Sequence, residues 1–357
     1  MTLIPRPLIT AAVAALLLAL IVGIFLATAP TPDEREGWML GPELPEPFGE
    51  LATVAVPVDD GRELLVVASG ISGFGRVVDD VYVFDSATDA WTQGPALPEP
   101  RHHAAAAVLD GAVIVSGGAP RLAEHPWRGT RTVWRWRPGD DGWERMPDLL
   151  EERWGHRMVE HGGRLYVVGG YGETGRTFVY RPDHEGWAEA APIPEPRDHL
   201  SVVVVGDRIW AIGGRSPRST ARVDIYDPGM DAWEDGPDLP QPTSGAAEGV
   251  IDGRIYIFGG EEPDLLEGAV FDRHWMLDTR RQPLRWEPAP RPPLAVHGAD
   301  GAVFEGRMVI VGGAGRHGLA SLTAWTPAFQ VMLPGDGDDP ATTPAAAPSA
   351  MRPLSQR

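Results

Sequence analysis

The chain has 357 residues and a formal net charge of −19, from 50 acidic and 31 basic side chains. This excess of negative charge argues against DNA or RNA as a partner. The absence of cysteine excludes disulfides, thiolate metal sites and cysteine nucleophiles. The 43 glycines and 36 prolines indicate many turns between short elements.

An uncharged apolar run of 22 residues, 8–29, is long enough to span a bilayer. Arg6 precedes this run and acidic residues follow it, which predicts that the N-terminus lies in the cytoplasm and the remainder outside it. A cleavable signal peptide is the competing interpretation, because Ala27-Thr28-Ala29 resembles a cleavage site. We predict a signal anchor, a transmembrane helix, over residues 1–30. The body is then exported, to the periplasm or the cell exterior.

A repeat occupies most of the remaining chain. Six apolar strands end in a pair of small residues: Ser69-Gly70, Gly117-Gly118, Gly169-Gly170, Gly213-Gly214, Gly259-Gly260 and Gly312-Gly313. Six tryptophans, spaced 44 to 53 residues apart, accompany them: Trp38, Trp91, Trp143, Trp187, Trp233 and Trp286. A period of this length in an all-strand pattern indicates small sheets repeated around an axis.

The order of elements is the same in each unit. An apolar strand is followed by a tight turn containing Gly or Asp, and a second apolar strand runs into the small pair. A third strand ends in an aromatic residue, and a fourth strand carries the tryptophan. The third-strand aromatics are Phe84, Trp136, Tyr180, Tyr226 and, by position, Trp325.

This order resembles the kelch repeat, in which Gly-Gly follows strand two, an aromatic closes strand three and Trp lies in strand four. The resemblance covers about Trp38 to Met332 and implies a β-propeller of four-stranded blades. We therefore predict an all-β, six-bladed kelch propeller over residues 31–332. Residues 333–357, rich in Pro, Ala, Asp and Thr, are predicted to be a disordered tail.

The ends of the repeat predict how the ring closes. No first three strands precede Trp38, and the last unit has no tryptophan at the expected position. We predict that the segment around Trp38 supplies the outer strand of the sixth blade, which removes an exposed sheet edge. The alternative is that Phe329–Leu333 forms this outer strand alone.

Binding residues are expected on the loops at one mouth of the channel, because loops on a rigid scaffold concentrate function. The candidates there are basic, aromatic or histidine residues: Arg101, His103, Arg153, His156, Tyr171, Arg197, His199, Arg215, His297 and Arg316. Together they would form a cationic mouth for a carboxylate or phosphate on a sugar or peptide. Arg101, Arg153 and Arg197 also have a structural interpretation, because each lies 16 residues before a small pair.

Catalytic chemistry has weaker support in the sequence. A metal site needs three or four converging ligands, and we predict no metal and no cofactor. Glu261 and Glu262, next to a glycine pair, could act with Arg215 in acid–base chemistry. The sequence contains no G-x-S-x-G or H-E-x-x-H motif.

Two functions follow from these observations. The first is a membrane-tethered, non-catalytic module that binds a protein or a glycan through its loop-lined face. The alternative is a sugar mutarotase or epimerase acting on an anionic sugar such as sialic acid, because periplasmic sialate mutarotases are distantly similar kelch propellers. That resemblance implies a glutamate and an arginine as acid–base residues, for which Glu261 or Glu262 with Arg215 are the nearest candidates.

Overall fold

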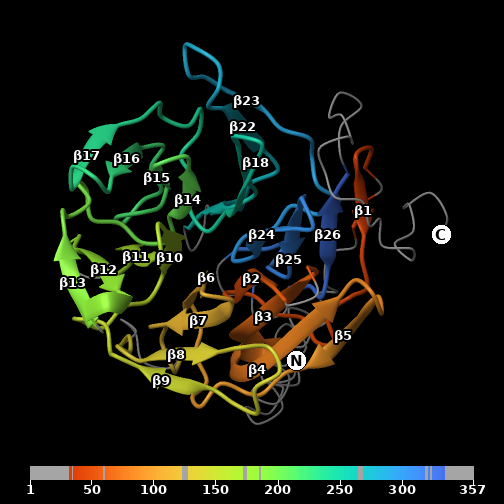
Figure 1. The fold of residues 1–357 in the computed structure, drawn as a ribbon. Helices are drawn as coiled ribbons and strands as arrows, with labels where there is room; N and C mark the ends of the chain where they lie inside the picture. The colour runs from red at the N-terminus through yellow and green to blue at the C-terminus, as the bar shows by residue number, and fades with distance from the viewer. Residues whose placement is uncertain are drawn as a thin grey trace, which may run out of the picture.

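The structure, a computed structural model, is a ring of small antiparallel sheets around a central axis (Figure 1). It describes residues 32–33, 35–58, 61–122, 128–171, 175–184, 186–263, 268–317, 321 and 324–333. Within these ranges, six sheets have four strands each and a seventh has two, with short 3₁₀ turns at Gly73–Gly75 (η1) and Pro182–His184 (η2). The prediction of an all-β, six-bladed propeller of four-stranded blades is confirmed.

Two of the predicted segments cannot be compared with the fold. The predicted helix over residues 1–30 lies outside the described residues, and so does the predicted tail from residue 334 onward. Within the described ranges, no helix has the length and apolar character of a membrane span.

Each blade runs from an inner strand beside the channel to an outer strand at the rim (Figure 1). Blade one is β2 (Ala52–Pro57), β3 (Glu63–Ser72), β4 (Arg76–Asp85) and β5 (Ala90–Gln93). Blade two is β6 (Ala105–Leu109), β7 (Ala112–Ser116), β8 (Val133–Trp136) and β9 (Glu144–Met146). Blade three is β10 (His156–His161), β11 (Arg164–Gly169), β12 (Thr177–Arg181) and β13 (Gly186–Ala190).

The other three blades follow the same plan. Blade four is β14 (Ser201–Val205), β15 (Arg208–Ile212), β16 (Val223–Asp227) and β17 (Ala232–Asp235). Blade five is β18 (Ala247–Ile251), β19 (Arg254–Phe258), β22 (His274–Asp278) and β23 (Trp286–Pro288), with a small added hairpin of β20 (Glu261–Glu262) and β21 (Ala269–Val270). Blade six is β24 (Asp300–Phe304), β25 (Arg307–Val311), β26 (Phe329–Met332) and β1 (Trp38–Leu40).

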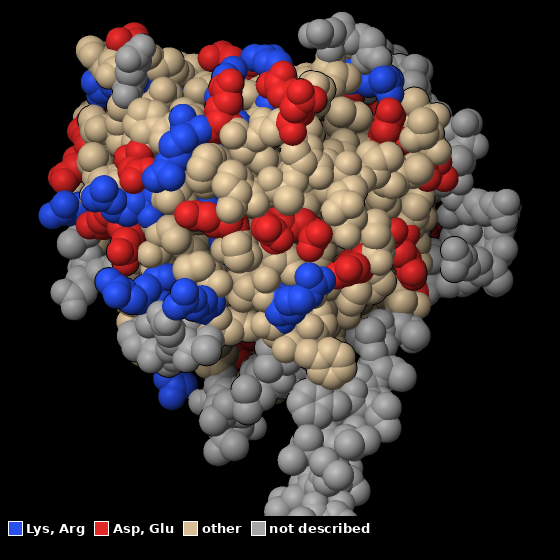
Figure 2. Space-filling view, turned by 90° about the horizontal axis from the view of Figure 1, so that it is seen from below, with Lys and Arg blue, Asp and Glu red and all other residues tan. Residues whose placement is uncertain are grey.

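Burial falls from the second strand of each blade to its outer strand. All five residues of β7 are buried, because both faces of that strand pack against neighbouring sheets. In contrast, β17 has no buried residue. The outer strands and turns therefore carry the charged surface, and a side view shows acidic and basic side chains interspersed on the rim (Figure 2).

The two ends of the repeat meet in one sheet. Strand β1 pairs antiparallel with β26, so that Trp38 lies opposite Met332. The prediction that the segment around Trp38 is the outer strand of the sixth blade is confirmed. The alternative, in which Phe329–Leu333 is the outer strand, is wrong because β26 is the third strand of this sheet.

The predicted place of Trp325 is also wrong. Trp325 precedes β26 and forms an isolated bridge with Ala314 in the connection between the second and third strands. Its ring packs in a small apolar cluster with Ile71, Ala314 and Leu122. The position opposite the blade tryptophan is taken by Met332 in blade six. The spacing of the repeat placed Trp325 in the third strand because it did not allow for the long connection before β26.

The blade tryptophans link neighbouring blades. Five of them donate an indole N–H bond of 2.8 or 2.9 Å to a backbone carbonyl of the preceding blade's linker: Trp91 to Pro42, Trp143 to Pro95, Trp187 to Pro147, Trp233 to Ala191 and Trp286 to Pro237. Trp38, at the seam, has a buried indole nitrogen with no hydrogen-bond partner among the described residues.

The glycine pairs are required by close approach between blades. Gly259 has a φ of +68°, and a Cβ placed there would lie 2.1 Å from the carbonyl oxygen of Val296 in the linker to blade six. A larger residue would therefore push the two blades apart.

Candidate functional site

A ring of six backbone hydrogen bonds surrounds one mouth of the channel. Its members stand one or two residues before the inner strands: Glu50, His103, Gly155, His199, Gly245 and Gly298. Each N–H donates to the carbonyl of the previous member, at 2.7 to 3.0 Å, and Glu50 donates to Gly298, so the circle is closed. We call these six residues the mouth ring. It lies on the face formed by the loops between strands two and three.

All six members of the mouth ring have a positive φ, between 51° and 63°. Glycine adopts this conformation readily, whereas other residues in it are strained. Blades three, five and six have glycine here, but Glu50, His103 and His199 are exceptions. A residue other than glycine keeps this strained conformation only where the surrounding structure stabilises it, and such residues cluster at functional sites. These three positions are therefore candidates for a functional role.

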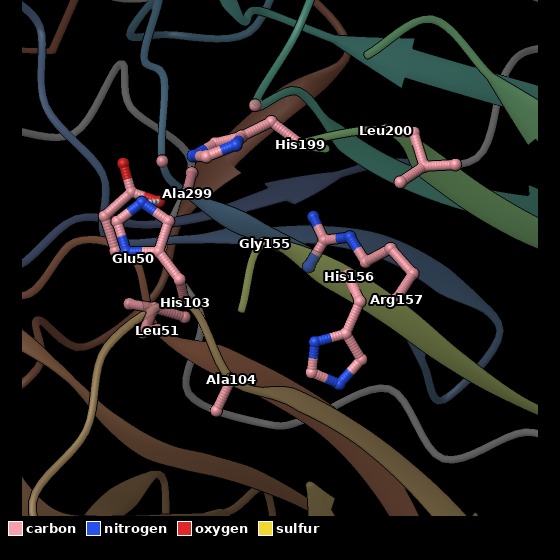
Figure 3. A pocket seen from close by; sticks show the side chains of 12 residues that line it. Glu50, Leu51, His103, Ala104, Gly155, His156, Arg157, His199, Leu200 and Ala299 are labelled. Carbon is pink, nitrogen blue, oxygen red and sulfur yellow. Dashed lines mark ion pairs between the residues drawn. The ribbon is translucent and has the colours of Figure 1, made fainter. Parts of the chain in front are cut away.

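The three exceptional side chains meet at the mouth (Figure 3). Glu50 Oε2 lies 3.1 Å from His103 Nε2, and the ring centroids of His103 and His199 are 4.8 Å apart. The void beside them encloses about 30 Å³, which is room for one or two water molecules. Burial lowers the pKa of His103 well below its usual value, so the imidazole is neutral at pH 7.

A second group of charged side chains adjoins His199. The Arg215 guanidinium donates to Asp198 Oδ1 and to Glu261 Oε1, at 3.0 Å each, and its third nitrogen lies 3.0 Å from His199 Nε2. His199 Nδ1 also contacts the Asp198 carboxylate. Although burial alone would raise it, the pKa of Asp198 is lowered by its contacts with His199 and Arg215. On the far side, His297 Nδ1 lies 3.4 Å from Glu261 Oε2.

The structure therefore brings together four of the predicted site residues: His103, His199, Arg215 and His297. It also joins Glu261 to Arg215, the pair that the sequence had indicated for acid–base chemistry. Glu262, in contrast, lies in the added hairpin, where its backbone pairs with Ala269 of β21. The mouth is not the cationic surface that we predicted, because it also carries three carboxylates: Asp198 and Glu261 pair with Arg215, and Glu50 pairs with His103.

Arg101, Arg153 and Arg197 lie inside the domain, not on a ligand-binding surface. Each is at most 3% exposed and donates to the carbonyl of the first residue of the pair that follows it: Gly117, Gly169 and Gly213. Burial lowers the pKa of Arg101 to about 10, which leaves it charged at pH 7. Their contacts support the structural interpretation, in which each arginine anchors a glycine pair within its blade.

The remaining candidates are dispersed. His156 points away from the mouth toward Ser116, with Nε2 3.0 Å from the hydroxyl, and burial lowers its pKa to about 3 (Figure 3). Tyr171 is 47% exposed and stacks on Trp154, with ring centroids 4.6 Å apart. Arg316 is exposed, and its backbone carbonyl lies 2.9 Å from His297 Nε2.

Sequence reasoning missed two residues of this site, Glu50 and Asp198. The mouth-ring residue lies 14 positions before the small pair in blades two to six but 19 positions before it in blade one. The longer β2–β3 hairpin thus concealed Glu50. Asp198 could have been found from the dipeptide Asp198-His199, which occupies the place of His102-His103 in blade two.

Below the mouth, charged side chains cross the channel. Arg157 of blade three contacts Glu248 of blade five, Nε to Oε1 at 2.9 Å, and Asp300 of blade six, at 2.9 Å. Burial raises the pKa of Glu248 to about 7 because the loss of hydration outweighs the attraction of Arg157. Below these side chains, the open part of the channel has a volume of about 380 Å³ and is lined by the inner strands of all six blades.

These observations define the class of protein, a closed six-bladed propeller. Its loop-lined mouth is plugged, in the sense that the side chains of Glu50, His103 and His199 fill it. A model of the KLHDC2/KLHL20/DRC7 Kelch-repeats domain matches residues 155–327. This match covers just under half of the chain and confirms the resemblance to the kelch repeat that its sequence shows.

Known proteins are similar to parts of this chain. Human Kelch-like protein 26 is 35% identical over 101 residues, which are 28% of this chain and 15% of that protein. Xenopus tropicalis Kelch-like protein 25 is 27% identical over 140 residues, 37% of this chain and 23% of that protein. Beta-scruin of Limulus polyphemus is 27% identical over 139 residues, which are 36% of this chain and 14% of that protein. The matches thus span less than a quarter of these relatives.

A solved structure titled "Structure of YjhT" has the same fold. It superposes with a TM-score of 0.68 and 18% identity, over 83% of this chain and 98% of that one. At this identity the likeness establishes the architecture, and function rests on the site itself.

Proposed function

We propose that this propeller is a non-catalytic binding module that captures a protein through its loop-lined face. The observation that carries the proposal is the combination of a plugged mouth with exposed aromatic side chains around it. Phe74 is 79% exposed at the tip of the long β3–β4 hairpin, and Tyr171 is 47% exposed on blade three. Aromatic side chains presented on rigid loops are typical anchors of protein interfaces.

The plugged mouth favours binding over sugar chemistry. A pocket for a small molecule has a volume of roughly 300 to 1,000 Å³, whereas the void at the mouth encloses about 30 Å³. The acid–base pair of the alternative, Glu261 with Arg215, is present, but Arg215 is occupied by three partners. The mutarotase remains the second candidate because of that pair, and a glycan remains the second class of ligand.

Photo-crosslinking in the producing cell tests the binding face. A crosslinking amino acid at position 74 or 171 is expected to form discrete adducts of higher mass. The matched control is position 230, where Met230 is 75% exposed in the β16–β17 turn on the opposite face. Adducts that form equally at position 230, or at none of the three positions, would contradict the proposal.

A separate assay addresses the mutarotase. The purified full-length chain is added to a freshly dissolved single anomer of sialic acid, and anomer exchange is followed by NMR. The uncatalysed rate is the expected result. If the wild type accelerates anomer exchange and Glu261→Gln does not, the protein is a mutarotase and the proposal of a non-catalytic binding module is wrong.

We also propose that the propeller is exported and tethered to the membrane by residues 8–29. The support is the length of the apolar run and the charges that flank it. The full chain is expected to remain in the membrane pellet after alkaline extraction, and protease added to spheroplasts should degrade its body. Release at alkaline pH, or protection from the protease, would overturn the tether or the export respectively.

A further inference from the structure

We propose that Glu50, His103 and His199 form a binding site for a divalent transition-metal ion at the centre of the mouth ring. The inference does not depend on the proposed binding function. One ligand atom from each residue lies within 4.8 Å of the others. An ion here would join the linkers that lead into blades one, two and four.

The chemistry of the donors fits such an ion. Two imidazoles and a carboxylate are ligands that zinc and its neighbours prefer, whereas Mg²⁺ and Ca²⁺ favour oxygen alone. With bonds of about 2.1 Å, tetrahedral ligand atoms lie roughly 3.4 Å apart. The separation of 3.1 Å between Glu50 Oε2 and His103 Nε2 is close to this value.

The surroundings of the histidines also fit. The Asp198 carboxylate contacts Nδ1 of His199, and His102 contacts Nδ1 of His103. Such outer contacts orient metal-bound imidazoles through the nitrogen that does not bind the ion. The void of about 30 Å³ has room for a water molecule as a fourth ligand.

The local charge favours a cation. Three carboxylates, from Glu50, Asp198 and Glu261, meet here with two guanidinium groups, those of Arg215 and of Arg157, which lines the void and also pairs with Glu248 and Asp300. Arg215 is also the competitor, since its nitrogen lies 3.0 Å from His199 Nε2. Binding of the ion would break this contact and leave Arg215 with its two carboxylates.

The backbone supplies the strongest argument. At all six ring positions φ is positive, and the three residues that are not glycine are the three proposed ligands. If backbone packing were the only requirement at these positions, glycine would satisfy it, as it does in blades three, five and six. Metal coordination is a reason to keep a strained side chain at these three places.

The same feature provides a sharp experiment. The variants Glu50→Gly, His103→Gly and His199→Gly introduce a residue that the ring already accepts, so the fold should be retained. Asp110→Gly is the matched control, because Asp110 has a φ of 50° in the β6–β7 turn, away from the mouth. Each protein is the full-length chain without an affinity tag. Circular dichroism verifies folding, and titration calorimetry with Zn²⁺ measures binding.

The wild type and Asp110→Gly are expected to bind one Zn²⁺ with the same affinity, and Mg²⁺ should not compete. Each ring variant should bind Zn²⁺ more than about 100-fold more weakly than the wild type. Loss of a contact that only orients a metal ligand already lowers metal affinity by about 10- to 100-fold. Arg215→Gln should bind more tightly than the wild type. A wild type that binds no Zn²⁺, or ring variants that bind it as the wild type does, would show that the cluster is only a hydrogen-bond network.

Discussion

Trp38 and Met332 lie opposite each other in the sixth blade, although 294 positions separate them in the chain. The indole of Trp38 also packs edge-on against Phe258 of blade five, with ring centroids 5.2 Å apart. The first described strand thus completes the last sheet and covers the boundary between two blades. Without it, the third strand of blade six would have an unpaired edge.

The seam should therefore contribute strongly to stability. Trp38 is 2% exposed, and Trp38→Ala is expected to lower the free energy of unfolding by about 3 to 5 kcal/mol. Trp134→Ala is the matched control, because Trp134 is only partly buried on β8 and should cost less. Urea unfolding followed by circular dichroism measures both. Equal losses would mean that closure by β1 adds nothing beyond ordinary packing.

A more conservative substitution separates packing from hydrogen bonding. Trp91 donates its indole N–H to the carbonyl of Pro42 at 2.8 Å, whereas the indole nitrogen of Trp38 has no partner in the described part of the chain. Trp91→Phe should therefore cost about 0.5 to 1.5 kcal/mol more than Trp38→Phe, the usual net value of one hydrogen bond. The same unfolding measurement applies, and a larger loss for Trp38→Phe would contradict the assignment.

The architecture was predictable because repetition makes a weak local signal strong. One glycine pair or one tryptophan proves little, but six in register predicted the blade number and the closing strand. Trp325 shows the limit, since a long connection before β26 shifted the expected position. The mouth was harder. Glu50 was hidden by the longer β2–β3 hairpin, and which arginines face inward depends on packing that composition does not reveal.

The buried arginines provide a test of that last distinction. Arg153 donates to the carbonyls of Gly169 and Arg176, at 2.7 and 2.9 Å. Arg153→Met should lower the free energy of unfolding by about 1.5 to 3 kcal/mol, as expected for hydrogen bonds from a charged group. Arg316→Met, at an exposed position, should change it by less than about 0.5 kcal/mol. Crosslinking from position 74 should be the same in Arg153→Met and the wild type at a temperature where both are folded. Loss of the crosslinked adduct in Arg153→Met would indicate that Arg153 belongs to the binding face after all.

The charged side chains that cross the channel predict a pH dependence. Glu248 is surrounded by Arg157, Asp300 and Ser201, and burial raises its pKa from 4.5 to about 7. Burial likewise raises the pKa of Asp300. A carboxyl whose pKa is higher in the folded state stabilises the fold when it is protonated. This contribution is complete below about pH 4.5 and is lost as the pH rises through 7.

Glu248→Gln removes the titration of this group and keeps an amide of similar shape. Between pH 4.5 and 8, the unfolding free energy of the wild type should fall relative to that of Glu248→Gln by on the order of 3 kcal/mol, at about 1.4 kcal/mol per pKa unit. The buried histidines titrate in both proteins, so their effect cancels in the difference. Glu160→Gln, at an exposed position of β10, controls for the loss of one carboxylate. Urea unfolding at several pH values gives the two curves, and parallel curves would show that Arg157 keeps Glu248 ionised throughout.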